Sequence, residues 1–167
     1  MQIGIIGGGT ETHLSEKAKK IAFEVGYDLA KNGIIVITGG CNGIMKYACE
    51  GAKKGGGITV GILPFYDEKL ANKFVDIKIK TGMSYGIRNN IIVHSADVLI
   101  GIAGGSGTLS EIALGDMYKK SVILIKGTGG WSDKLKYFNL DEKKKTKIIF
   151  VKSAKEGVSK AIKILKS

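Results

Sequence analysis

Short apolar runs alternate along the chain with longer segments whose apolar residues recur every three to four positions. The short runs are rich in Ile and Val, and several are continuous, as expected for strands that are buried on both faces. We predict seven strands, at residues 2–6, 34–38, 58–63, 75–79, 97–102, 122–126 and 148–151.

The longer segments predict helices at residues 15–32, 43–54, 84–95, 108–119 and 153–165, with Gly33 and Gly55 as stop signals after the first two. Regular alternation of strands and helices is typical of a parallel sheet covered by helices. The pattern therefore predicts one α/β domain over residues 1–167, a Rossmann-like three-layer fold with a mostly parallel sheet of about seven strands. Residues 127–147 form an insert, in which Trp131 could either cover a ligand or pack.

Glycine-rich loops follow the first, second and fifth predicted strands. Loops at the carboxyl ends of parallel strands line the ligand crevice of such a sheet, so all three should open on the same side. Glycine lets backbone amides turn toward an anion, and the following helix adds its positive N-terminal end. These loops predict a phosphate site. Its ligand-binding residues are predicted to be Gly8, Gly9, Thr10, Gly39, Gly40, Asn42, Gly43, Gly104, Gly105, Ser106, Gly107 and Thr108.

Standard nucleotide fingerprints are absent from these loops. The chain contains no G-x-x-x-x-G-K-[ST], and its first loop does not complete G-x-G-x-x-G. These absences argue against Walker-type ATP hydrolysis and against NAD-dependent redox chemistry.

Arg88 and Glu111 are the candidate catalytic residues. Arg88 is the single arginine among 26 basic residues, which favours a role that needs a planar, bidentate cation. We expect it to contact a phosphate or a base edge; the alternative is an ion pair with Asp97 or Glu111. Glu111 could act on a ligand beside the phosphate loop, or it could complete a capping box with Thr108 at the start of the helix.

The net charge of +11 permits a nucleic-acid partner, but the scattered lysines and the near absence of arginine argue against one. The chain contains neither a membrane-length apolar segment nor a secretory leader, so we expect a cytoplasmic protein without membrane contact. Cys41 and Cys49 match no metal or dithiol spacing and are interpreted as small packing residues. His13 and His94 lack partners at ligand spacing, so neither a metal site nor a resident cofactor is expected.

Two glycine motifs resemble those of the LOG-type phosphoribohydrolases. Residues 104–111, GGSGTLSE, are similar to the G-G-x-G-T-x-x-E motif of that family, and residues 39–45, GGCNGIM, to its G-G-G-x-x-G-L-M. The resemblance covers about residues 2–126. It implies a Rossmann-like dimer that hydrolyses the N-glycosidic bond of nucleoside 5′-monophosphates. In such an enzyme Arg88 would orient the nucleotide and Glu111 would serve the ribosyl centre.

The chain departs from the family pattern at three places. Ala103 replaces the proline before the two glycines, Asn89 replaces the basic residue after the arginine, and Met83 stands five residues before Arg88. These departures make the chain look closer to the molybdenum cofactor carrier proteins, in a group that is distantly similar to DNA-processing proteins. Three hypotheses follow: a hydrolase, a carrier or sensor of a phosphorylated pterin or nucleotide, and a single-strand DNA binder. A homodimer or homotetramer is expected, with the apolar side of the 84–95 helix at its interface.

Overall fold

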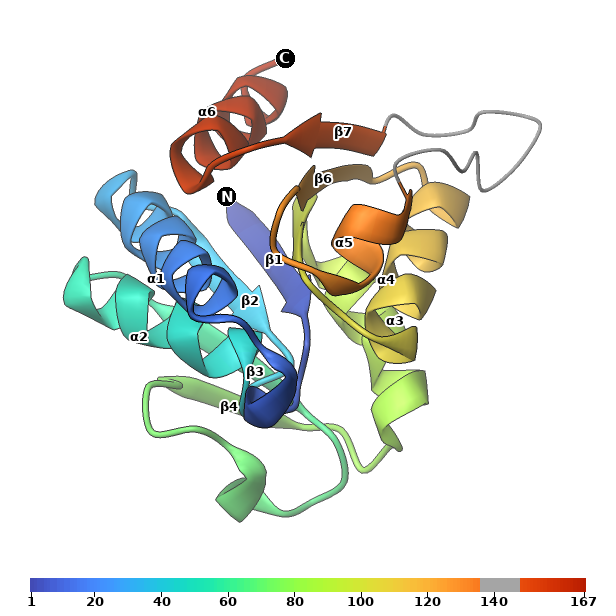
Figure 1. Ribbon diagram of the computed structural model, residues 1–167. Coiled ribbons are helices and arrows are strands. Elements are labelled where there is room, and N and C mark those ends of the chain that lie inside the picture. Colours follow the sequence, from blue (N-terminus) through green and yellow to red (C-terminus); the bar gives the residue numbers. More distant parts are fainter. Residues whose placement is uncertain (136–147) are drawn as a thin grey trace.

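Seven parallel strands form the sheet of the computed structural model, which describes residues 1–135 and 148–167 (Figure 1). Their order across the sheet is β4-β3-β2-β1-β5-β6-β7, and each neighbouring pair is parallel. The predicted Rossmann-like α/β fold class is therefore confirmed. In chain order the strands are β1 (Gln2–Gly7), β2 (Ile35–Thr38), β3 (Thr59–Leu63), β4 (Ile77–Lys80), β5 (Val98–Ile102), β6 (Ser121–Ile125) and β7 (Ile148–Val151).

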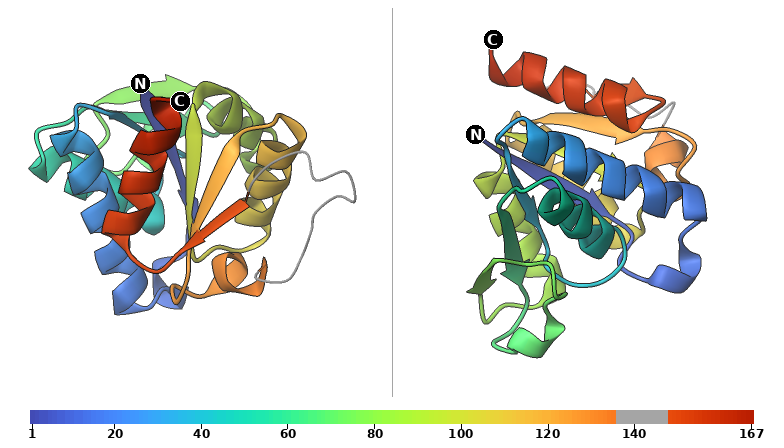
Figure 2. Two further views of the ribbon diagram at one scale, coloured as in Figure 1. Left: turned by 90° about the horizontal axis from the view of Figure 1, so that it is seen from above. Right: turned by 90° about the vertical axis from the view of Figure 1, so that its left-hand side faces the viewer.

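Helices cover both faces of the sheet, which gives three layers (Figures 1 and 2). One face carries α1 (Glu16–Lys31), α2 (Ile44–Lys54) and α6 (Ala154–Leu165), and the other carries α3 (Tyr85–Ser95), α4 (Ser106–Met117) and α5 (Gly130–Lys134). Two short 3-10 helices, η1 (Glu11–His13) and η2 (Glu68–Leu70), lie in loops. Among the described residues, no helix combines the length and the apolar character that crossing a membrane requires.

Each face of the sheet has its own hydrophobic core. The apolar stripe Ile21, Val25 and Leu29 of α1 is buried against the sheet, as the helical spacing predicts. Ile92 of α3 and Ile112 of α4 are buried in the core on the opposite face. This packing fixes α3 and α4 beside each other on the same face of the sheet.

The predicted elements agree with the observed ones except near a few ends. The strand expected at 75–79 is β4, which begins at Ile77, and α1 begins at Glu16 with Ser15 as its N-cap. The helix α4 begins at Ser106 instead of residue 108, and this difference affects the interpretation of the residues in its first turn. The predicted insert at 127–147 contains α5, a helix that the periodicity did not reveal, and residues 136–147 lie outside the described part of the chain.

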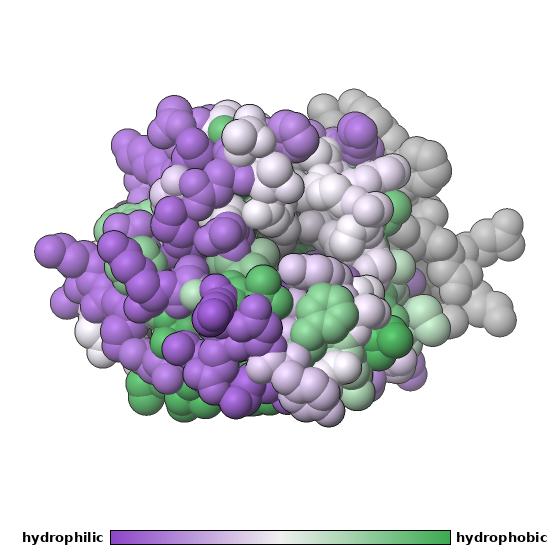
Figure 3. Space-filling view, turned by 90° about the horizontal axis from the view of Figure 1, so that it is seen from below, coloured by the Kyte–Doolittle hydropathy of each residue, from purple (hydrophilic) through white to green (hydrophobic). Residues whose placement is uncertain are grey.

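The order of the strands places a switch point beside β1. From β1 the chain moves outward through β2 and β3 to β4, then returns to the other side of β1 with β5. Ligand crevices in such sheets form at the carboxyl edge where the strand order reverses. Figure 3 looks at that edge. Strongly hydrophilic residues gather on one side of the view, and residues of near-neutral hydropathy occupy much of the rest, with hydrophobic ones among them.

Candidate functional site

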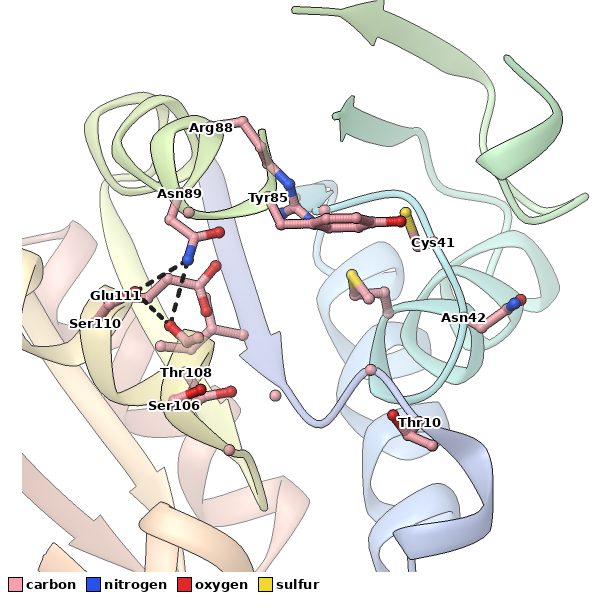
Figure 4. A pocket seen from close by; sticks show the side chains of 18 of the residues that line it. Thr10, Cys41, Asn42, Tyr85, Arg88, Asn89, Ser106, Thr108, Ser110 and Glu111 are labelled. Atoms are coloured by element: carbon pink, nitrogen blue, oxygen red, sulfur yellow. Dashed lines mark hydrogen bonds between the residues drawn. The ribbon is translucent and has the colours of Figure 1, made fainter. Parts of the chain in front are cut away.

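A cavity of about 860 Å³ opens at the carboxyl edge between the loops after β1, β2 and β5. It receives residues from all three glycine loops and from the first turns of α3 and α4 (Figure 4). Of the residues proposed from the sequence, those that line it are Gly9, Thr10, Gly39, Asn42, Arg88, Gly105, Ser106, Gly107, Thr108 and Glu111.

The remaining predicted glycines, Gly8, Gly40, Gly43 and Gly104, do not line the cavity. They serve close packing of the loops around it, because a side chain at each would collide with a neighbouring residue. Gly43 has φ +68°, and a side chain there would collide with the carbonyl of Gly8. Gly104 has φ +107°, and a side chain there would collide with Thr108. These glycines therefore shape the loops that border the cavity.

The N-terminus of α4 supplies backbone amides to the cavity. Its N-cap is Gly105, which has no side chain to satisfy the first amides of the helix. The positive end of the helix dipole lies at the same place. Because α4 begins at Ser106, Thr108 is its third residue and cannot be its N-cap. The capping-box interpretation of Glu111 is therefore wrong.

The turn that leads into α4 is held in an unusual conformation. Ala103 has φ +55°, a left-handed value that costs an alanine free energy. The Ala103 amide donates to Thr128 Oγ1 at 2.9 Å, and its carbonyl accepts from Ser132 Oγ at 2.9 Å. The start of the predicted insert thus supports the turn. Trp131 packs against the core beneath α3 and α4 and does not line the cavity, in agreement with its packing interpretation.

Arg88 lies on α3 and is only 5% exposed. Its Nε is buried and has no hydrogen-bond partner, and no described carboxylate lies within ion-pair distance of its guanidinium. Burial lowers the pKa of Arg88, although the nearby Glu111 opposes that shift. The alternative of an ion pair with Asp97 or Glu111 is wrong, because neither carboxylate lies within ion-pair distance of the guanidinium. The Asp97 carboxylate accepts instead from the backbone amide of Gln2 at 2.9 Å.

Glu111 is buried on α4, with a side chain that faces the cavity (Figure 4). Burial raises the pKa of its carboxyl from 4.5 to about 8, even though Arg88 lowers it. This shift favours the protonated form of Glu111 near neutral pH. None of the described residues donates a hydrogen bond to its carboxyl group, so that group is free to interact with a ligand.

Some cavity residues were not proposed from the sequence. Tyr85 and Asn89 share the cavity-facing side of α3 with Arg88, at a helical spacing that could have identified them. Asn89 Nδ2 donates to Ser110 Oγ at 3.0 Å and so ties α3 to the first turns of α4. Cys41 also lines the cavity, which corrects its interpretation as a packing residue; Cys49 is buried and does pack. Burial raises the pKa of the Cys41 thiol, while Arg88 lowers it.

Comparison with known proteins agrees with this architecture. An uncharacterized protein from Archaeoglobus fulgidus is 45% identical over 126 residues, which are 75% of this chain and 80% of that protein. The molybdenum cofactor binding protein of Rippkaea orientalis is 36% identical with a TM-score of 0.85, over 99% of this chain and 97% of that one. The molybdenum cofactor carrier protein of Chlamydomonas reinhardtii is 32% identical with a TM-score of 0.86, over 99% and 98% of the chains.

DNA processing protein A of Helicobacter pylori, at 21% identity and a TM-score of 0.69 over 98% of this chain and 80% of that one, shares the fold alone. A protein family also matches this chain. The SLOG cluster4 family matches residues 1–158, nearly the whole chain and every part of the cavity described above. This chain belongs to the SLOG cluster4 family.

Proposed function

We propose that this chain binds a phosphorylated small molecule, with the phosphate held between the N-terminus of α4 and Arg88. The observation that carries the proposal is the buried guanidinium of Arg88, which has an Nε without a partner and lines the cavity. Burying a cation without a partner costs free energy. A phosphate in the cavity would offset that cost, because its oxygens accept strong, charge-assisted hydrogen bonds from a guanidinium.

The backbone at the start of α4 supports the same proposal. Gly105, Ser106 and Gly107 all line the cavity, and no side chain caps the helix there. A helix N-terminus with free amides is a general anion site, and a cation beside it adds to the affinity. Gly105 also leaves its surroundings open, since a Cβ at that position would meet no atom within 4 Å.

Isothermal titration with ribose 5-phosphate and with AMP tests the proposal. The Arg88→Met variant is expected to bind both compounds roughly ten- to 150-fold more weakly, since about 1.5–3 kcal/mol is lost with a hydrogen bond to a charged group. Lys160→Met on α6 removes the same charge on the far face of the sheet and is the matched control. Failure of both compounds to bind the unmodified protein, or equal binding by Arg88→Met, would contradict the proposal.

One form of this proposal is that the phosphorylated molecule is the cargo of a carrier. It is supported by the similarity to a molybdenum cofactor binding protein and to a molybdenum cofactor carrier protein, at 36% and 32% identity over nearly their whole length. A phosphorylated pterin would use the same phosphate site, and a carrier should retain it through purification. Native mass spectrometry of the purified protein is expected to show a bound mass that disappears in Arg88→Met.

Hydrolysis of a nucleoside 5′-monophosphate is the second candidate function. It is favoured by Glu111, which faces the cavity and does not cap its helix. Water would add to C1′ of the ribose while the base leaves with a proton, so that AMP yields adenine and ribose 5-phosphate. A protonated Glu111 could donate that proton. Chromatography after incubation with AMP should then show adenine, and Glu111→Gln should abolish its release; an absence of adenine would exclude this activity.

A further inference from the structure

The cavity-facing side of α3 carries an aromatic ring beside the buried cation. Tyr85 and Arg88 are three residues apart and both line the cavity, and the Cζ of Arg88 lies 6.0 Å from the centre of the Tyr85 ring. Tyr85 is 51% exposed even though it borders a buried site. Part of its ring is therefore available to a molecule in the cavity (Figure 4).

The position of this ring is set by a second aromatic residue. Phe65 meets Tyr85 edge to face, with ring centres 5.6 Å apart and planes at 86°. Phe65 is itself fixed to the loop before α3, because its amide donates to the Met83 carbonyl at 2.8 Å and its carbonyl accepts from the Gly82 amide at 3.0 Å. Tyr85 is thus held in place in the free protein, and such preorganisation lowers the entropic cost of binding.

Gly86 provides an independent indication of a ligand next to Tyr85. It lines the cavity in the first turn of α3, where glycine is a poor helix former. A Cβ at this position would meet no atom within 4 Å, and the φ of Gly86 does not lie in the left-handed region. Neither packing nor backbone conformation therefore requires glycine here. The bare backbone leaves a flat, open surface beside the ring.

We propose that Tyr85 and Gly86 form a second subsite, which receives a planar aromatic heterocycle of the ligand. This inference rests on the proposed phosphate binding and extends it: the ligand carries both a phosphate and a flat ring, as a nucleotide or a phosphorylated pterin does, and a sugar phosphate fills only half of the site. Stacking on an aromatic side chain accepts many different heterocycles. The neighbouring Ile87 is 58% exposed and does not line the cavity, so the subsite is confined to the cavity side of the helix.

The ratio of two affinities tests the subsite. AMP carries a ring and ribose 5-phosphate does not, so the unmodified protein is expected to bind AMP roughly ten- to a hundredfold more tightly, the range of a base stacked on an aromatic side chain. Tyr85→Leu should bring the two affinities close together, and Tyr85→Phe should keep most of the preference. Gly86→Ala should also reduce the preference for AMP while leaving the thermal stability equal or higher, since alanine is the better helix former.

Tyr118→Leu is the matched control, because this tyrosine lies at the other end of α4 and does not line the cavity. It is expected to keep the preference for AMP. Equal affinities of the unmodified protein for AMP and ribose 5-phosphate, or an unchanged ratio in both Tyr85→Leu and Gly86→Ala, would overturn the subsite and leave the phosphate site standing. If neither compound binds the unmodified protein, the phosphate site and the subsite are both wrong.

Discussion

Gly39 lies directly against the guanidinium of Arg88, so that any side chain at position 39 would occupy the space of the cation. The two residues are 49 positions apart and come from the loop after β2 and from α3. The φ of Gly39 does not lie in the left-handed region, so the contact with Arg88 alone explains why position 39 is a glycine. The glycine loop after β2 therefore contributes to the site by making room for the arginine.

Gly39→Ala is expected to displace Arg88 and to weaken AMP binding by roughly ten- to a hundredfold, measured by titration calorimetry. The free energy of unfolding should fall by about 1–3 kcal/mol, the usual cost of inserting a methyl group into a tightly packed place. In the Arg88→Ala background the collision is absent, so Gly39→Ala should cost less there. A coupling of about 1 kcal/mol or more in urea denaturation of the four proteins is expected, and simple additivity would argue against this contact.

Replacement of Ala103 tests the strained turn before α4. Ala103→Gly should be neutral or stabilise the fold by about 1 kcal/mol, because glycine adopts φ +55° without penalty. Ala103→Pro would restore the proline of the LOG-type pattern, yet proline cannot reach this φ and would remove the amide that donates to Thr128. A loss of about 3 kcal/mol or more is expected by urea denaturation. A stable, ligand-binding Ala103→Pro protein would show that the turn can adopt another conformation.

The stability of the protein should depend on the protonation of Glu111. Because burial raises the pKa of this carboxyl to about 8, the folded state keeps a proton that the unfolded chain releases near pH 4.5. The stability that depends on this proton is complete below pH 4.5 and is lost as the pH rises to about 8. Within that window the loss approaches about 1.4 kcal/mol per pH unit. Glu111→Gln should flatten the profile in urea denaturation between pH 5 and 8, whereas parallel profiles would indicate that Glu111 is ionised in the folded protein.

Self-association through α3 and α4 is a further expectation. Ile87 and Met117 are 58% and 61% exposed on these helices, which lie side by side. Ile87→Asp is expected to reduce the mass of the protein in sedimentation equilibrium to that of a monomer, because a charge there would oppose burial against a second copy. Ile58→Asp is the control, since Ile58 is half exposed at the opposite end of the sheet, just before β3. A monomeric unmodified protein would contradict the expectation.

The strands and most helices could be predicted from the sequence, because the spacing of apolar residues reflects which face of an element is buried. The continuous Ile and Val runs that became β1, β5 and β6 are buried on both faces, and Ser15 marks the start of α1 as an N-cap should. The start of α4 was predicted two residues late, since Thr108 resembles an N-cap while Gly105 fills that role without a side chain. The short α5 has too few residues to show a period.

The sequence predicted where the candidate site lies, but it did not predict how the residues of the site contact one another. By itself, the sequence placed three glycine loops at one edge of a parallel sheet and singled out Arg88 and Glu111, because residue type and position after a strand are local properties. The tertiary structure alone decided that Gly39 faces Arg88, that Gly43 and Gly104 serve loop packing, that Tyr85 borders the cavity, and that burial raises the pKa of Glu111. These features depend on contacts between distant parts of the chain. The burial of one face of a helix or strand produces a periodic pattern in neighbouring residues, but a contact between distant residues produces none.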